Sequence, residues 1–494
     1  MNKPTELLSK ISNACLRMGR SGYFSLLALV LVFVAVFHKP LLLGKCVSRI
    51  GESALRDGAF RGDTLPAPLF PDFDPCLYLW YLPVRDFLGG ALAQGLFPAW
   101  NPYRAFGYPE LSHPSQSFFN PVLLPSPVSQ EYLYCALLIL QTLVGAIGTW
   151  LVCRKLRLSA WSAFWAATAF GLSCRLLGGL ELALFDCFVP FLFLSILYLR
   201  DSAISTRGFV QAVDRPLLRV VLVAMLWAYG FLSMHLEVYV ISLFATLLCF
   251  GVDIPLSKAL ACRSPERVGW RYLLFVAGAG LLALAAVAPL MVPMLKHLLA
   301  CDFYKVALAS GLDAKFPELL RDALGWTGCD GVPLRSIFAG AATFLLLPAA
   351  FVLRWRPEVR VTGLLALIAL AWSYPTVWLA ELLSRPPFSW LAPQYFLTIG
   401  VLAVSLLSAC GLHELLQLRQ RQQKVVGSLL VTLGPLLAIA ICAVLGSALN
   451  CKPVALLIPA IAIALLVGIV WSRGVIRQAL LTALVCINVA TLVN

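Results

Sequence analysis

Long apolar runs recur from Tyr23 to Val493 and limit what this chain can fold into. Each run is close to the ~20 residues that a helix needs to cross the hydrocarbon of a bilayer. The chain has 60% hydrophobic and only 13% charged residues, with a mean hydropathy of +0.86, which is unlike a soluble domain. The sequence therefore predicts an all-α polytopic membrane protein with about 11 to 13 transmembrane helices.

The apolar runs set the expected spans. The run 160–174 is short, and 361–379 contains Pro375, where a helix could break. No small-residue cleavage site follows Val36, so we expect a retained first helix rather than a secretory signal. An odd number of spans would put the two termini on opposite sides. The expected spans are 22–40, 132–152, 160–174, 180–199, 217–232, 237–252, 272–292, 337–353, 361–379, 394–416, 425–447, 453–471 and 475–493.

The net charge of +14 is distributed in a pattern that encodes orientation. Basic residues cluster on every second connection between spans, as membrane proteins show on their cytoplasmic side. The pattern predicts a multi-pass protein of the cytoplasmic membrane with a cytoplasmic N-terminus, and it favours anionic headgroups rather than nucleic acid. The basic clusters lie in 3–20, 154–157, 200–219, 258–271, 354–360, 419–424 and 473–477.

Two long segments, 41–130 and 293–336, interrupt the otherwise short connections and fall on the same outer side. We expect them to be loops of a single transmembrane domain that covers 1–494. Large loops on one side are typical of a catalyst or receptor that faces that side. If the outer compartment is oxidising, Cys301 and Cys329 could form a disulfide in the second loop.

Two carboxylates, Asp72 and Asp74, flank Phe73 in the first outer loop. Residues i and i+2 of an extended segment point to the same face, so both could converge on one ligand or on a divalent cation such as Mg²⁺ or Mn²⁺. Alternatively, one of them caps a helix that starts near Leu77, because Asp before Pro75 is a good start signal for a helix. Both interpretations stay open at this stage.

The rest of the first loop predicts an element that lies on the membrane surface. Residues 77–96 have apolar side chains near helical spacing and end at Gln94-Gly95, which indicates an interfacial helix. A turn-rich aromatic segment follows, and such surfaces suit sugars or lipid headgroups. Its candidate substrate-binding residues are Trp100, Asn101, Tyr103, His113 and Gln116.

A dense motif runs through this loop. It consists of Asp74, Pro83, Gly95, Pro98, Trp100, Asn101, Pro102, Tyr103, Gly107, Pro109, Pro114, Gln116, Ser117, Phe119 and Pro121. The order resembles the first outer loop of the bacterial YfhO-like membrane proteins, a branch of the polytopic GT-C glycosyltransferases. Residues 232–237 are similar to a Gly-His-Pro-Gln/Glu segment of that family, from which Met234 and Leu236 depart. The segments 288–296 and 385–395 also resemble the family, although Gln394 stands where an Arg is common.

The resemblance implies a GT-C-like fold and an inverting transfer of sugar from a polyprenyl-phosphate donor to a glycan, lipid or protein acceptor at the outer face. It implies Asp74 as the catalytic base, with Asp72 assisting it or binding a cation. Cationic side chains would stabilise the departing phosphate, and we expect these to include Lys296, Lys305 or Arg385. The remaining candidate substrate-binding residues are His235, Glu237, Gln394 and Tyr395.

Several alternatives remain beside this interpretation. His235 and Glu237 could be a polar pair at a turn that water satisfies. Arg175, Glu181 and Asp186 could be ion partners of one another, or they could line the site. A flippase or other transporter for lipid-linked glycans and a non-catalytic scaffold for envelope assembly are the competing functions.

Overall fold

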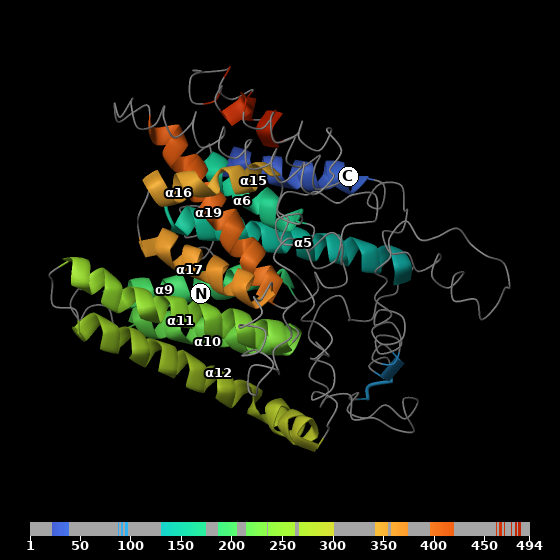
Figure 1. Ribbon diagram of the computed structural model, residues 1–494. Helices are drawn as coiled ribbons and strands as arrows, with labels where there is room; N and C mark the ends of the chain where they lie inside the picture. The colour runs from blue at the N-terminus through green and yellow to red at the C-terminus, as the bar shows by residue number, and fades with distance from the viewer. Residues whose placement is uncertain are drawn as a thin grey trace, which may run out of the picture.

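The described part of this computed structural model is all-α (Figure 1). The structure describes residues 22–38, 130–173, 186–204, 214–234, 236–261, 266–300, 341–353, 357–373 and 396–418, with short pieces within 87–96 and 461–485. The all-α prediction is confirmed for these residues. The helices are a first helix, Gly22–Val36, followed by α5 (Gln130–Lys155), α6 (Ala160–Gly171), α9 (Val189–Ile204), α10 (Asp214–Ser233), α11 (Leu236–Ala261), α12 (Glu266–Ala300), α15 (Ala341–Leu345), α16 (Leu347–Leu353), α17 (Pro357–Ser373) and α19 (Phe396–Leu418).

Several helix boundaries differ from the expected spans; for example, α9 ends at Ile204 and α11 at Ala261, beyond the expected ends at 199 and 252. The second outer loop was expected to begin at 293, but α12 continues to Ala300 through Pro289 and Pro293. Proline removes one backbone hydrogen bond without necessarily ending a helix, and the apolar sequence continues beyond both prolines. In contrast, α17 ends at Ser373, just before the segment that contains Pro375.

The expected span 337–353 is wrong as a single helix, because α15 and α16 are separated at Leu346. Pro348 explains the break: it has no N–H to donate to the carbonyl of residue 344, and its ring would clash with that carbonyl. The helix therefore restarts with Pro348 in the first turn of α16, where a missing N–H costs nothing. Leu346 packs against Gly411 of α19, where even the Cβ of an alanine would collide with the Leu346 carbonyl.

A short piece of the first outer loop is also described. Phe87, Gly90 and Ala91 are helical, and the Leu96 N–H donates to the Ala91 carbonyl at 2.9 Å. Gly95 has a φ of +69°, the left-handed conformation that commonly closes a helix. The predicted end of the helix at Gln94-Gly95 is therefore confirmed.

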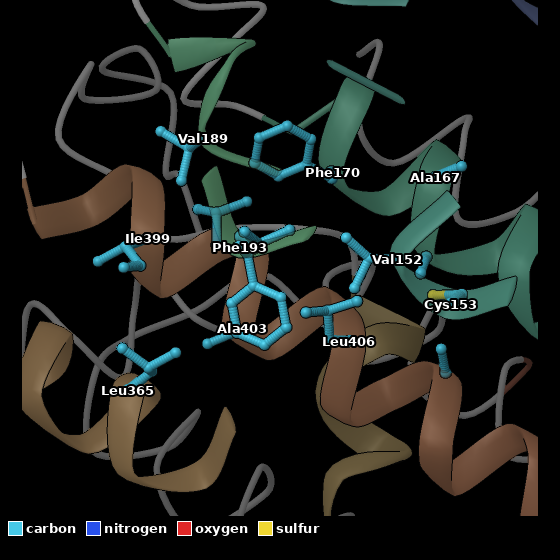
Figure 2. Close-up of a cluster of buried hydrophobic side chains, with 14 of the residues drawn as sticks. Val152, Cys153, Ala167, Phe170, Val189, Phe193, Leu365, Ile399, Ala403 and Leu406 are labelled. Carbon is cyan, nitrogen blue, oxygen red and sulfur yellow. The ribbon is translucent and has the colours of Figure 1, made fainter. Parts of the chain in front are cut away.

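The centre of the bundle is α19. Every residue of Phe396–Leu415 is buried, Leu416 and Gln417 are half-buried, and α6, α16 and α17 pack along this helix. Figure 2 shows Ile399, Ala403 and Leu406 of α19 among buried side chains from other helices, including Phe193 of α9 and Leu365 of α17. This enclosed helix is therefore the axis on which the other helices are placed.

Hydrogen bonds between helices give the direction of each helix. The start of α9 lies beside the start of α19, because Thr398 Oγ1 donates to Asp186 Oδ2 at 2.7 Å. The start of α10 lies beside the end of α9, because Arg219 Nη1 donates to Ser202 Oγ at 3.0 Å. We call the end where α9 and α19 begin and α10 ends the Asp186 end, and the opposite end the Arg219 end.

Three buried or half-buried Trp–Ser pairs join neighbouring helices by the same arrangement. In each pair the indole N–H donates to a serine Oγ, and that hydroxyl donates to the backbone carbonyl three residues earlier. Each indole N–H is thus satisfied inside an apolar interior, where leaving it without a partner would be costly. The pairs are Trp150–Ser25, Trp165–Ser408 and Trp227–Ser195, with N···O distances of 3.1, 3.1 and 2.8 Å.

The exposed helix α12 contains a span-length segment that is as apolar as the enclosed helix α19. Two described helices are long and apolar enough to cross a membrane by length and composition, over Trp270–Pro293 of α12 and Phe396–Gln417 of α19. The α12 segment has the higher mean hydropathy, 2.4 against 1.9, yet only 17% of it is buried. Figure 1 shows α12, in yellow, at the edge of the bundle. A soluble bundle would instead place polar side chains on the outer face of such a helix.

The Trp165–Ser408 bond makes a specific prediction for stability. Ser408→Ala should lower the free energy of unfolding by about 1–3 kcal/mol, because it leaves the buried indole N–H without its acceptor. Ser405→Ala is the matched control, since the buried Ser405 hydroxyl has no hydrogen-bond partner among the described residues. Denaturant unfolding of both variants in the same detergent is the measurement, and equal losses would contradict the role of the pair.

Candidate functional site

A fully buried carboxylate marks one end of the bundle. Asp186 precedes α9, is 0% exposed and accepts a 2.7 Å hydrogen bond from the Thr398 hydroxyl in the first turn of α19. A hydrogen bond to a carboxylate is roughly twice as strong as one between neutral groups. Residues 212 positions apart in the chain are thereby fixed at the Asp186 end.

Aromatic contacts hold the surrounding helix ends. Trp372 of α17 stacks on Phe396 of α19, with ring centroids 4.6 Å apart. Phe188, two residues after Asp186, meets Tyr229 of α10 edge to face at 5.3 Å. Such pairs contribute about 0.5–1.5 kcal/mol beyond the area they bury. The carboxylate is therefore set in a well-packed frame formed by α9, α10, α17 and α19.

The structure places two of the predicted site residues at this end. Glu237 lies in the first turn of α11, directly after the turn from α10. Lys296 is exposed in the last turns of α12, whose opposite end carries Tyr272 near Arg200 of α9. The described residues do not show Lys296 in contact with Asp186.

Three other predicted site residues, His235, Gln394 and Tyr395, lie outside the described residues, but their neighbours in the sequence lie at this end. Met234 precedes His235 and is buried after the end of α10, while Phe396 follows Gln394 and Tyr395 and begins α19. The sequence segments that resemble the glycosyltransferase family therefore lead into the Asp186 end. The remaining predicted residues lie outside the described part of the chain: Asp72, Asp74, Trp100, Asn101, Tyr103, His113, Gln116, Lys305 and Arg385, together with His235, Gln394 and Tyr395 themselves.

The described residues hold no group of three His, Cys, Asp or Glu side chains that could bind a metal ion. The predicted cation ligands, Asp72 and Asp74, lie outside the described ranges, as do Cys301 and Cys329. Four described cysteines, Cys153, Cys187, Cys249 and Cys410, are buried. A buried cysteine packs as a small apolar residue.

A second buried polar group lies near the opposite end of α19. His413 Nδ1 accepts from the backbone N–H of Ser159 at 3.0 Å, at the N-cap of α6. Because a backbone N–H can only donate, His413 is neutral and carries its proton on Nε2. Gln417 Nε2 lies 2.8 Å from His413 Nε2, and exchanging the nitrogen and oxygen of this amide would give the ring N–H an acceptor.

Sequence reasoning missed both of these connections between helices. Asp186 was considered with Arg175 and Glu181, but nothing in the local sequence points to Thr398 as its partner. For His413 a signal was available, because an ionisable residue inside an apolar span normally has a specific partner. Neighbouring Glu414 is buried as well and carries the same signal.

The Asp186–Thr398 bond can be tested by a double-mutant cycle. Thr398→Val is nearly isosteric and removes the donor, so it should cost about 1.5–3 kcal/mol of unfolding free energy. Thr398→Ser keeps the hydroxyl and is the matched control. In an Asp186→Asn background the difference between Val and Ser should shrink, since the charged acceptor is gone. An unchanged difference in that background would refute the coupling.

Comparisons with protein-family models, with curated proteins and with solved structures find no match for this chain. The resemblance of the first outer loop to glycosyltransferases stays a prediction from its residues. The function is therefore argued below from the sequence motif and from the geometry of the bundle.

Proposed function

We propose that the protein is a multi-pass integral membrane protein. The support is the apolar surface of α12, because its segment Trp270–Pro293 has a mean hydropathy of 2.4 although only 17% of it is buried. Large side chains such as Leu274, Leu281 and Phe244 are more than half exposed. In water a continuous apolar surface of this size would drive association, whereas hydrocarbon accepts it without cost.

The distribution of charge supports one orientation in that membrane. Lys155, at the end of α5, forms a 2.6 Å ion pair with Asp201 and lies over the Tyr198 ring, which places the end of α5 at the Arg219 end. Basic residues of the cytoplasmic side gather at one end of a membrane protein, and we assign the Arg219 end to that side. The basic residues of this end include Arg154, Lys155, Arg157, Arg200, Arg219, Arg271 and Arg360.

Within this membrane protein we propose a GT-C-type glycosyltransferase that moves a sugar from a polyprenyl-phosphate donor to an envelope acceptor. The observation that carries the proposal is the motif from Asp74 to Pro121 in the first outer loop. The geometry adds support, because the chain around His235 and Gln394 leads into the same end as the buried Asp186. That end is the outer one in the proposed orientation.

The proposed reaction is an inverting displacement. The acceptor hydroxyl oxygen attacks the anomeric carbon, the bond from that carbon to the phosphate oxygen breaks, and polyprenyl phosphate leaves. Asp74 takes the hydroxyl proton as general base. Lys296, Lys305 or Arg385 stabilises the charge on the departing phosphate. Asp72 either assists Asp74 or holds a divalent cation together with it.

A transporter is less well supported. A charged path through the bundle would need ionisable groups in its middle, and α19 has no acidic or basic side chain between Phe396 and Gly411. The buried Ser408 hydroxyl there donates to the Ser405 carbonyl of its own helix. A scaffold without catalytic activity stays the alternative if the carboxylates of the first loop prove dispensable.

The orientation predicts the labelling of single cysteines in a cysteine-free background. Ser115→Cys, Asp313→Cys and Lys296→Cys should react with an impermeant maleimide from outside. Arg157→Cys, Arg207→Cys and Gln420→Cys should react only after permeabilisation. Labelling of Arg157→Cys or Gln420→Cys from outside would contradict the assignment of the two ends.

The catalytic proposal predicts the effect of Asp74→Asn. This change keeps size but removes the proton acceptor, so sugar transfer from a synthetic polyprenyl-phosphate sugar should fall by about 10²–10⁴. Asp201→Asn removes the same charge from the ion pair at the Arg219 end and should leave transfer intact. Donor binding and expression should persist in both variants. Unchanged transfer by Asp74→Asn would favour the scaffold.

A further inference from the structure

Two helices begin with the same arrangement of charges. α10 opens with Asp214-Arg215 and has Arg219 four residues later, and α12 opens with Glu266-Arg267 and has Arg271 four residues later. An acidic first residue is favoured by the helix dipole, while arginines spaced by four residues lie on one face of their helix. The sequence thus has two arginines and one acidic residue near the start of each helix.

These two starts lie at the same end of neighbouring helices. Val220 Cγ1 is 3.7 Å from the position that a Cβ on Gly278 would take, so α10 and α12 approach closely there. Figure 1 shows the two helices side by side at the edge of the bundle. Tyr272, next to Arg271, lies within electrostatic range of Arg200 at the end of α9. Both starts therefore belong to the Arg219 end.

The cations border an apolar surface. Arg219 and Arg271 are exposed, and Trp270 beside Arg271 is 69% exposed. Along α12 only a narrow stripe faces the bundle, formed by residues such as Ala279 and Ala283. Apolar side chains cover the exposed faces around these arginines: Leu217 and Leu218 directly before Arg219, Leu222 and Met225 after it, and Leu273, Leu274, Leu281 and Leu284 after Arg271.

The acids nearby leave this surface positive. Asp201 at the end of α9 is held by Lys155, and Arg219 keeps one guanidinium nitrogen on Ser202. The two helix starts together carry four arginines against two acids. Guanidinium groups have several donors in a planar fork that matches the oxygens of a phosphate group.

We propose that the starts of α10 and α12 form a binding site for an anionic phospholipid. Arg219 and Arg271 hold its phosphate, Trp270 lies at headgroup depth, and the acyl chains run along the exposed leucines of α10 and α12. A lipid fits better than a free phosphate because the cations lie directly at the rim of the apolar surface. The site rests on the membrane placement proposed above and is independent of the glycosyl transfer.

The test uses the full-length protein in nanodiscs made of an equal mixture of phosphatidylcholine and phosphatidylglycerol. Native mass spectrometry of the released protein gives the ratio of the two lipids that stay bound. Wild type should retain phosphatidylglycerol in preference. Arg219→Gln with Arg271→Gln should lower that preference about fivefold for each charge removed, the equivalent of ~1 kcal/mol per basic residue at an anionic surface.

The matched control, Arg157→Gln with Arg360→Gln, removes two charges from the same end, one in the turn after α5 and one in α17, and should keep the preference. Arg219→Lys with Arg271→Lys keeps the charge, guards against misfolding of the glutamine variant and should keep most of the preference. Equal losses in both glutamine pairs, or no preference in wild type, would overturn the site. Failure of the protein to enter nanodiscs would instead overturn the membrane placement itself.

Discussion

The burial of Phe396–Leu415 in α19 is the constraint on which the rest of the described bundle depends. A polar side chain without access to water is stabilised by a hydrogen-bond partner within the protein. Thr398 donates to Asp186, Ser408 accepts from Trp165, and His413 accepts from the backbone N–H of Ser159 at the N-cap of α6. These bonds lie at the beginning, middle and end of α19 and fix α9 and α6 against it. Gly411 has no Cβ, which lets the Leu346 carbonyl between α15 and α16 pack directly against α19.

The exposed faces of the outer helices are apolar, and their charged residues lie near the helix ends. α10 and α12 expose leucines, and their arginines are confined to the helix starts. A bilayer accounts for both features, because apolar side chains face hydrocarbon while cations and Trp270 lie at headgroup depth. The two proposed functions lie at opposite ends of the bundle. The proposed lipid site occupies the Arg219 end, and the proposed chemistry belongs to the Asp186 end.

Periodic and local features could be predicted from the sequence, and contacts between distant segments could not. Apolar length placed most of the described helices within a few residues, and Gln94-Gly95 marked a helix end correctly because glycine chemistry is local. The split at Leu346 was missed, although Pro348 carried the signal. The extension of α12 to Ala300 was missed because Pro293 suggested an end. Thr398 could not be paired with Asp186 from sequence, since long-range partners depend on how the helices pack. The first-loop motif still predicts a site that lies outside the described residues.

The central claim is that α12 faces lipid, and spin-label accessibility tests it most directly. Single labels at Leu281 and Leu284, on the exposed face, and at Ala283, on the buried stripe, would be compared in the reconstituted protein. The account predicts high collision with oxygen and low collision with a water-soluble nickel reagent at Leu281 and Leu284, with both low at Ala283. Nickel accessibility at Leu281 equal to that at the exposed Lys296 would contradict it, because the apolar face of α12 would then lie in water.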